Sequence, residues 1–579
     1  MHDAIRITVA SNVQQRSKAP LLIPASTTLA SAIKALVFKT ASSKLRIKKP
    51  SRVYAAKSGQ ELLTDDDWEK WIDNDATLLV SAGEEYVGLK REDSRHAQAN
   101  PSCPTYILAE RAPVDHSSII QVTTTAHTLP GIIYGVGQPD LHPGTKFPIG
   151  AVFVSKGWIH PPLIGGDIGC GMAWYKTKLS RSQVDGDKGR KIAEKLRRLE
   201  GAWRSQPDRE YWLRDAAGSC SAGVEWDASL GTIGAGNHFA EIQVVEESCL
   251  IGDSSSVLEE NDVILLVHSG SRGFGGSVFK KYTSESRVSL EEGSEKMKAY
   301  MAEHDQACRW AKANRDLIAV RFLSCLEPGE TTWEVGRNAS NVHTDAETIL
   351  QARAKIQERK VVDIWHNNVE RVKWPPLPLP LPSPPPPPSP SSAYPAAIPD
   401  PEVTAEKLRP ESSGTRQVQE QDWVYIHRKG AAPVHTPKTT NPLALLPLPG
   451  SRGTPTLILV PTFSPSTSYG ALNALSLAHG AGRSMSRAKA LSSLGHKYKG
   501  QNLVEPGMNN GNAGKDEGGH GQGTWVICDE KDLVFEEAPE AYKDVHAVGE
   551  DLVREGVAVV AGWCRARVSY KVRNDEGSV

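Results

Sequence analysis

The feature of this sequence that most restricts its fold is a run of prolines in the second half of the chain. The segment WPPLPLPLPSPPPPPSPSSAYPAAIPDPE (374–402) cannot form a helix or a central strand, because proline has a fixed φ angle and no backbone N–H. It predicts an extended, solvated insertion over about 374–420 that interrupts a folded domain. Such an insertion is either passive or a ligand for an SH3 or WW domain.

The chain has 579 residues, more than one hydrophobic core of ordinary size, so at least two domains are expected. In the first 90 residues, the apolar patterns predict the order strand, strand, helix, strand, helix, strand. This order is typical of the ubiquitin-like β-grasp superfold, and VYAAKSGQELLTDDDWEKWIDNDATLLVSAGEEY (53–86) is similar to a doublecortin-type domain. We therefore expect a β-grasp domain at 1–90 that binds a protein partner, a polar linker at 91–104 and a larger domain at 105–579.

In the larger domain, strand-like apolar runs alternate with helical ones, which predicts an α+β fold. DVILLVHSG (262–270) predicts a strand that leads into a Gly-rich turn. SEKMKAYMAEHDQACRWAKANRDLIAV (294–320) has apolar residues at helical spacing and predicts one long helix. VHTPKTTNPLALLPLP (434–449) and EPGMNNGNAGKDEGGHGQG (505–523) predict loops, because they are rich in residues that break regular structure.

Charge and cysteine content restrict the ligands and the environment of the chain. Lys and Arg number 67 and Asp and Glu number 68, so any nucleic-acid site must be a local patch. The eight cysteines are scattered without close pairs, which is typical of a reducing compartment. No signal-peptide pattern and no stretch of membrane-spanning length is present. We expect a soluble cytoplasmic or nuclear protein without membrane association.

Polar clusters beside glycines are spread along the larger domain. In chain order they are GVGQPDLHPGTKFPIG (135–150), LIGGDIGCGMAW (163–174), GTIGAGNHFAEIQ (231–243), VHSGSRGFG (267–275), DIWHNN (363–368), IHRKGA (426–431), LPGSRGT (448–454) and SLAHGAGR (476–483). Each is expected at a strand end or in a turn, where binding and catalytic residues are normally placed.

Asp167, Cys170 and histidines from these clusters form a candidate metal set. A carboxylate, a thiolate and imidazoles together suit Mn, Fe, Co or Zn, and do not suit Ca or Mg. Only Asp167 and Cys170 are close in sequence, so the spacing differs from that of a structural zinc finger. The alternative is that each histidine is a hydrogen-bonded core or turn residue without a metal.

His479 lies among small residues in SLAHGAGRSMSRAKA (476–490). Glycine and alanine allow a ligand to approach the backbone closely, and the cations Arg483, Arg487 and Lys489 suit a phosphate or a polyanion. The alternative is a helix-capping histidine in a Gly-rich turn.

Taken in order, the segments GGDIGC, GNHFAE, HSGSRG, HN, HRKGA, GSRG, HGAGR and EEAPEAYK resemble the RtcB family of RNA ligases over about 105–575. GGDIGCGM and SLAHGAGR are most similar to the branch of this family that is coupled to release factor H. The resemblance implies an α+β domain with mixed sheets. It also implies GTP-dependent joining of RNA 3′-phosphate or 2′,3′-cyclic phosphate ends to 5′-hydroxyl ends, in RNA repair or tRNA splicing.

The resemblance also implies roles for individual residues. His479 matches the nucleophile that takes GMP from GTP. Two Mn²⁺ ions are implied, one held by Asp167 and His238 and the other by His268 and His366, with Cys170 shared by both. The implied guanylate pocket consists of Asn237, His238, Phe239, Ala240, Glu241, His366, Asn367, Pro449, Gly450, Ser451, Arg452, Thr456, Gly480, Ala481, Gly482 and Lys571.

Two features depart from the family pattern. The family usually has Ser-Tyr after GSRG, and this chain has Thr456-Leu457 instead. This departure changes one residue that the resemblance places in contact with the guanylate. Insertions at about 374–420, 434–447 and 463–474 flank the clusters IHRKGA, LPGSRGT and SLAHGAGR. We expect them to affect how the substrate enters the site and how fast it turns over.

The implied partners are RNA with the ends described above and an archease-like activator. The cations Arg483, Arg487, Lys489, Lys497 and Lys499 are either a local RNA-binding patch or, for the last three, a solvated helix face. Two other functions remain open at this point. One is a metal-dependent RNA-end phosphodiesterase or phosphatase, and the other is a non-catalytic homologue that binds RNA or a protein partner.

Overall fold

The computed structural model divides the chain into two compact units, residues 1–97 and 98–579. The residues that it describes are 5–87, 100–249, 258–284, 289–338, 346–377, 421–436, 441–499, 503–504 and 523–572, apart from 14, 16, 25, 26, 28, 57, 73–75, 198 and 200. Each unit is described by itself below. Most of the predicted linker, most of the proline-rich insertion and most of the predicted loop 505–523 lie outside the described residues.

The N-terminal unit is a four-stranded sheet with two helices. Its elements are β1 Ile5–Ser11, β2 Lys18–Ile23, α1 Ala30–Lys44, β3 Arg52–Ala55, α2 Asp65–Trp71 and β4 Thr77–Ser81. The strands lie in the order β2-β1-β4-β3, with β1 and β4 parallel and the outer pairs antiparallel. Alternate side chains of the strands pack against Ile33 and Val37 of α1. The predicted order of elements is confirmed.

The larger unit contains two main mixed sheets. The eight-stranded sheet has the order β15-β9-β13-β12-β23-β20-β19, with β22 beside β23, and the five-stranded sheet has the order β16-β17-β7-β6-β5. Their strands are β5 Thr105–Ile107, β6 Ile132–His142, β7 Ile149–Ser155, β9 Gly171–Lys176, β12 Phe239–Ser248, β13 Val263–Ser269, β15 Lys360–Trp365, β16 Asn367–Trp374, β17 Asp422–Lys429, β19 Leu446–Pro449, β20 Thr456–Pro461, β22 Trp525–Cys528 and β23 Ala558–Lys571. The prediction of an α+β fold with mixed sheets is confirmed.

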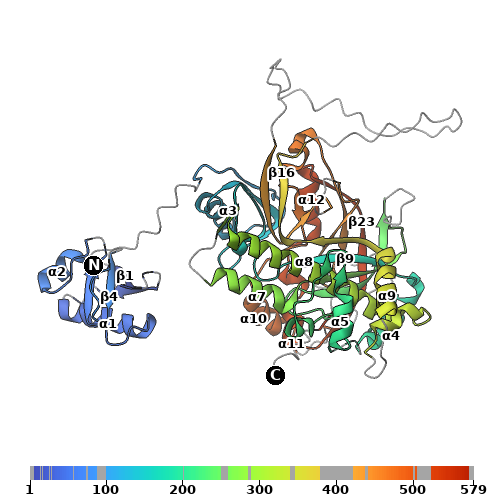
Figure 1. The fold of residues 1–579 in the computed structure, drawn as a ribbon, viewed down its shortest axis with the longest axis horizontal. Helices are drawn as coiled ribbons and strands as arrows, with labels where there is room; N and C mark the ends of the chain where they lie inside the picture. The colour runs from blue at the N-terminus through green and yellow to red at the C-terminus, as the bar shows by residue number, and fades with distance from the viewer. Residues whose placement is uncertain are drawn as a thin grey trace, which may run out of the picture. The chain divides into compact units, whose positions relative to one another are not determined.

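Helices cover one side of the eight-stranded sheet (Figure 1). The larger unit has the helices α3 His116–Thr128, α4 Asp187–Leu196, α5 Gln206–Trp212, α6 Val224–Asp227, α7 Arg272–Thr283, α8 Glu295–Leu326, α9 Ala346–Arg359, α10 Arg487–Lys497, α11 Lys531–Glu536 and α12 Val545–Arg554, with the short turn η7 Pro539–Ala541. Those in the core on that side are α4, α5, α7, α8 and α9, whereas α3 packs on the five-stranded sheet and α12 contacts β23, β20 and β6. The predicted strand at 262–270 and the predicted long helix at 294–320 are confirmed as β13 and α8.

The two faces of the larger sheet have different partners. Ala173 and Tyr175 of β9 belong to the core that contains α8, whereas Met172 and Trp174 belong to the core shared with the five-stranded sheet. The alternation of side chains along a strand explains this division. The unit therefore has a helical layer followed by two sheet layers, and α3 packs on the outer face of the five-stranded sheet.

One predicted loop is wrong in part. Within 434–449, residues Leu446–Pro449 form β19, which pairs with β20. Proline is tolerated there because β19 is at the edge of the sheet and pairs on one side only. The alternating Leu446 and Leu448 are buried and favour the strand.

Among the residues that the structure describes, no helix combines the length and the hydrophobicity needed to cross a bilayer.

Candidate active site

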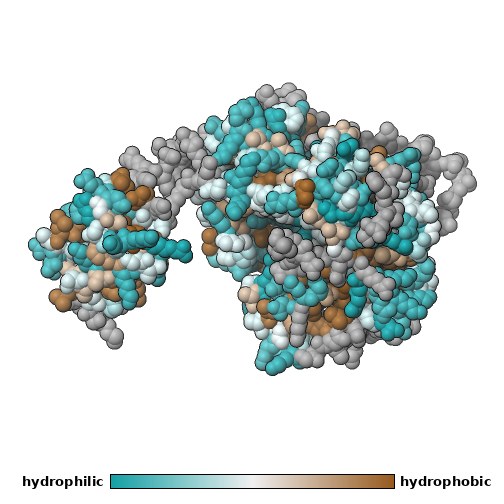
Figure 2. Space-filling model, turned by 60° about the horizontal axis from the view of Figure 1, so that its bottom comes forward, coloured by the Kyte–Doolittle hydropathy of each residue, from teal (hydrophilic) through white to brown (hydrophobic). Residues whose placement is uncertain are grey.

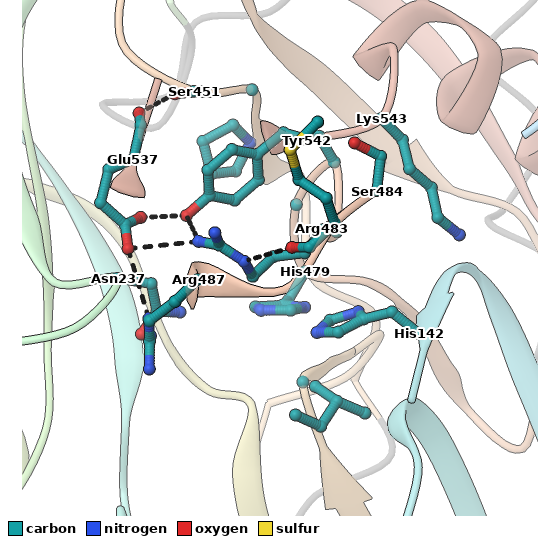
Figure 3. A pocket seen from close by; sticks show the side chains of 18 of the residues that line it. His142, Asn237, Ser451, His479, Arg483, Ser484, Arg487, Glu537, Tyr542 and Lys543 are labelled. Carbon is teal, nitrogen blue, oxygen red and sulfur yellow. Dashed lines mark hydrogen bonds and ion pairs between the residues drawn. The ribbon is translucent and has the colours of Figure 1, made fainter. Parts of the chain in front are cut away.

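A cavity of about 980 Å³ in the larger unit brings together residues from most of the polar clusters. The predicted site residues that line it are Asp167, Cys170, Asn237, Phe239, Glu241, His268, His366, Asn367, Pro449, Gly450, Ser451, Arg452, His479, Gly480, Ala481, Gly482 and Lys571. These residues come from segments up to 404 positions apart, between residues 167 and 571, so the two sheets and their loops assemble the site. Figure 3 shows part of this cavity, with His479 at its centre.

The first half of the site is a cluster of possible metal ligands at one end of the larger sheet. Because β9, β13 and β12 are adjacent, His268 lies opposite Met172 on one side and opposite Phe239 on the other. Cys170 directly precedes β9 and His238 directly precedes β12, so both side chains lie next to His268. The sulfur of Cys170 lies 3.2 Å from Nε2 of His238 and 3.3 Å from Nε2 of His268.

Asp167 and His366 extend this cluster on its two sides. Oδ2 of Asp167 lies 2.8 Å from Nε2 of His238. Nε2 of His366 lies 3.2 Å from Nε2 of His268. Each of the five residues predicted to bind metal therefore contacts at least one of the others, and together they form one continuous cluster.

The chemistry of this set fits a transition-metal ion. Nε2 of His268 lies close to both the Nε2 atom of His366 and the sulfur of Cys170. This nitrogen has either one proton or one lone pair, so it can form a hydrogen bond with one of these atoms but not with both. Burial lowers the pKa of His268 and of His366 well below the usual value, which keeps both rings neutral and able to donate a lone pair. Imidazole, thiolate and carboxylate ligands suit Mn, Fe, Co or Zn.

Cys170 gives the same indication. Burial and the neighbouring Asp167 carboxylate raise the pKa of its thiol well above the usual value. A thiolate at this place therefore requires a nearby cation, and a bound metal ion deprotonates a coordinating thiol. The residues fit a metal site, with Cys170, His238 and His268 as its most compact part.

His479 lies beside this cluster and is held by Asp140. Its ring centroid is 4.6 Å from that of His366. Nδ1 of His479 lies 2.7 Å from Oδ2 of the fully buried Asp140, and the His479 backbone N–H donates to the same oxygen. An ionised carboxylate only accepts hydrogen bonds, so Nδ1 carries a proton, and in the neutral ring the lone pair is then on Nε2. His479 follows the short strand β21 Ser476–Ala478 and caps no helix, so the capping alternative is wrong.

Glycines allow these close contacts around His479. A Cβ atom on Gly430, which has φ +67°, would lie 2.9 Å from Cε1 of His479. A Cβ atom on Gly482, which has φ +70°, would lie 2.2 Å from the carbonyl oxygen of Asp140. Both positions combine a left-handed backbone with no room for a side chain, which explains the small residues of HRKGA and HGAGR.

The opposite wall of the cavity is organised by the buried Glu537 (Figure 3). Its carboxylate lies 3.2 Å from Arg483, 3.5 Å from Arg487 and 3.6 Å from Lys571, and it accepts a hydrogen bond from Tyr542. Although burial opposes ionisation, Lys571 and Arg483 lower the pKa of Glu537. One buried anion thus fixes three cations at the cavity wall, which suits a phosphorylated ligand.

The predicted cation patch is divided by the structure. Arg483, Arg487 and Lys489 line the cavity. Lys497 forms an ion pair with Glu540 at 3.1 Å on the exposed side of α10, and Lys499 is also exposed. For Lys497 and Lys499, the structure therefore agrees with the alternative of a solvated helix face.

Some predicted residues do not line the cavity. Ala240 and His238 lie behind its surface, the latter in contact with Cys170. Thr456 reaches the site only through Gln243, whose amide donates to Oγ1 of Thr456 at 2.8 Å and to Glu241 at 2.9 Å. Burial raises the pKa of Glu241.

Sequence reasoning assigned no role to Asp140, Glu537 or Lys543. Asp140 lies in the cluster GVGQPDLHPGTKFPIG, and Glu537 and Lys543 lie in EEAPEAYK. Membership of these clusters is the sequence feature that could have pointed to the three residues. Lys543 donates to the carbonyl groups of Pro139 and Leu141 at 2.9 and 2.7 Å, so it holds the backbone on both sides of Asp140. Burial lowers the pKa of Lys543 to about 8.

His427, from the cluster IHRKGA, does not belong to the site. It is buried, does not line the cavity, and its Nε2 accepts a hydrogen bond from the backbone of His160 at 2.9 Å. For this residue, the alternative of a hydrogen-bonded core histidine holds.

Comparison with known proteins identifies relatives of most of the larger unit. The family model of the tRNA-splicing ligase RtcB matches residues 121–213, 208–371 and 413–572. RNA-splicing ligase RtcB2 of Escherichia coli is 31% identical over 463 residues, which cover 79% of this chain and 93% of that protein. RNA-splicing ligase RtcB homolog 1 of Entamoeba dispar is 24% identical over 511 residues, covering 77% and 80% of the two chains. The tRNA-splicing ligase RtcB of Thermococcus kodakarensis is 26% identical over 498 residues, covering 74% and 86%.

Proposed function

Because this chain belongs to the RtcB family of RNA-splicing ligases, we propose that it joins RNA 3′-phosphate or 2′,3′-cyclic phosphate ends to 5′-hydroxyl ends, with GTP and Mn²⁺. The observation that carries this proposal is the placement of His479. Its Nε2 lone pair is set by Asp140, its ring touches that of His366, and cations line the same cavity. A phosphodiesterase or a binding protein requires no such nucleophile, so the ligase is favoured over both.

The chain's own residues perform the following chemistry. Nε2 of His479 attacks the α-phosphorus of GTP, so that a P–N bond forms and the P–O bond to pyrophosphate breaks. An oxygen of the RNA 3′-phosphate then attacks the phosphorus of GMP, which breaks the P–N bond and frees His479. The 5′-hydroxyl oxygen of a second RNA attacks the 3′-phosphorus, its proton is lost, and GMP leaves. A 2′,3′-cyclic phosphate is first hydrolysed by water, which breaks the P–O bond to the 2′-oxygen and gives the 3′-phosphate. We assign the binding of the GTP phosphates to Arg452, Arg483 and Lys571, which line the same cavity.

Two metal ions complete the proposed site. Asp167 and His238 would hold one ion, His268 and His366 would hold the other, and Cys170 would contribute to both. When bound, the two ions neutralise charge on the phosphate and on the leaving oxygen.

Labelling with GTP tests the proposed function. The full chain is incubated with Mn²⁺ and GTP labelled at the α-phosphate, and RNA with a 3′-phosphate and RNA with a 5′-hydroxyl are then added. We expect a labelled protein that is acid-labile and alkali-stable, as phosphoramidates are, and that loses its label as joined RNA appears. Joining without any labelled protein, or the absence of both, would exclude the proposed route.

Replacing Asp140 by asparagine should impair the nucleophile without removing it. Asparagine can still accept from the ring and from the His479 backbone N–H through its amide oxygen, but it carries no negative charge. It therefore stabilises less the positive charge that develops on the ring when Nε2 forms the P–N bond. We expect GMP-adduct formation to fall by roughly 10²-fold or more, as when a buried aspartate that orients a catalytic histidine is lost. Replacing Asp187, an exposed aspartate in the first turn of α4 that does not line the cavity, by asparagine is the control, and it should leave adduct formation within about twofold, as expected for a surface substitution. Equal rates for both variants would contradict the role of Asp140.

For the N-terminal unit, we propose a β-grasp adaptor at 1–90 joined by the linker 91–104 to the ligase domain 105–579. The described residues of the cavity all belong to the larger unit. A chain that begins at residue 98 should therefore form the GMP adduct at the rate of the full chain. A folded but inactive shortened chain would show that the chemistry depends on the N-terminal unit.

A further inference from the structure

The first sixty residues of the chain have an unusual distribution of charge. No Asp or Glu occurs between Asp3 and Glu61, whereas eleven Lys and Arg residues occur in the same stretch. The whole chain has a formal net charge of −1, so this excess is local. In Figure 2, hydrophilic residues lie between apolar ones on the visible face of the N-terminal unit. The charge distribution indicates an anionic ligand for this unit.

Four of these cations are concentrated in the turn between α1 and β3. Lys44, Arg46, Lys48 and Lys49, which we call the basic turn, are exposed. The intervening apolar residues Leu45 and Ile47 pack against the core of the unit. This alternation directs the cations outwards and anchors the backbone between them.

The backbone of the basic turn is held in a defined shape. The N–H groups of Leu45 and Ile47 both donate to the carbonyl oxygen of Ala41, which closes the end of α1. Arg46 and Lys49 have φ values of 55° and 53°, in the left-handed region where glycine or asparagine is the usual residue. Cations occupy these positions although they cost about 1 kcal/mol each in backbone strain. Glycine would adopt these φ values without strain, so the geometry of the turn alone does not explain the cations.

No carboxylate neutralises the basic turn among the residues that the structure describes. By contrast, the nearby Arg52 forms a two-bond ion pair with Glu61 at 2.9 and 2.7 Å. Lys34 lies over the ring of Phe38. The four cations of the turn have no such partner in the described part of the unit, so their charge is available to a ligand.

We propose that the basic turn binds the phosphate backbone of the RNA that the ligase domain joins. The inference rests on the proposed function, which supplies RNA as the ligand. Three of the four residues are lysines, which are depleted in protein–protein interfaces but enriched where phosphates are bound. No aromatic ring in the described part of the unit is fully exposed to stack on bases. The binding is therefore independent of sequence, and the tether to the ligase domain raises the local concentration of RNA.

The test uses the full chain and a mixed-sequence, single-stranded RNA of thirty nucleotides, without GTP. Replacing Lys44, Arg46, Lys48 and Lys49 together by glutamine should weaken RNA binding at least about tenfold at low salt. The slope of log K against log salt should decrease by about 2.8, because each phosphate contact in a single strand contributes about 0.7. A second variant, with Lys44, Lys48 and Lys49 replaced by arginine, keeps the charge and should bind RNA like the parent.

A matched control removes four exposed cations from α4, where Lys188, Arg190, Lys191 and Lys195 alternate with Asp187 and Glu194. Their replacement by glutamine should leave RNA binding unchanged. The proposal is overturned if the basic-turn variant binds RNA like the parent, or if the α4 variant loses as much affinity. It is also overturned if polyglutamate of similar charge binds the parent more tightly than RNA, which would indicate an acidic protein partner. GMP labelling of all variants separates these outcomes from a failure of the proposed ligase reaction, which would remove the adduct from the parent.

Discussion

Replacement of His479 by alanine is expected to abolish the GMP adduct completely and to leave the bound metal in place. Nε2 of this ring is the proposed nucleophile, and alanine offers no atom that can form the P–N bond. The ligands of the proposed metal site are separate side chains, so the metal content should stay at the parental value. Labelled GTP and metal analysis on the same preparation measure both quantities.

The matched control is His496, an exposed histidine near the end of α10. Its replacement by alanine should leave the labelling of the protein unchanged. If the His479 variant kept its label, another residue would be the nucleophile. If it lost both label and metal, the loss of labelling would report on the metal site instead.

Replacement of Cys170 by serine is expected to remove more metal than the loss of any other ligand. In the proposed arrangement, its sulfur serves both ions, whereas His268 serves one. A site with two metal ions should hold about two ions per chain in the parent, about one in His268→Ala, and between none and one in Cys170→Ser. Labelling with GTP should fall to background in the cysteine variant.

The control is Cys325, a partly exposed thiol near the end of α8. Its replacement by serine should leave about two ions per chain and normal labelling. Mg²⁺ prefers rigid sites built from oxygen ligands, so full activity with Mg²⁺ alone would contradict the proposed ligand set. A Cys170→Ser protein that retained two ions would show that the sulfur is not shared.

Local sequence determined much of the secondary structure of this protein. The continuous apolar run at 262–270, which ends at a Gly-rich turn, is sufficient to predict β13, a strand buried on both faces. The helical spacing at 294–320 is sufficient to predict α8. The order of elements in the N-terminal unit follows from the same patterns. The predicted loop at 434–449 was wrong at β19, because whether prolines are tolerated depends on whether the strand is at an edge.

The sequence by itself also determined which reactive side chains are available, since the polar clusters contain the thiol, the carboxylates, the imidazoles and the cations. Only the tertiary structure decided which of them meet. Asp140 and His479 are 339 residues apart and touch because β6 and the segment after β21 lie side by side, whereas His427 is turned into the core. Such contacts depend on how two sheets stack and which strand faces which loop. These choices are made by the packing of the whole unit, so no local pattern records them.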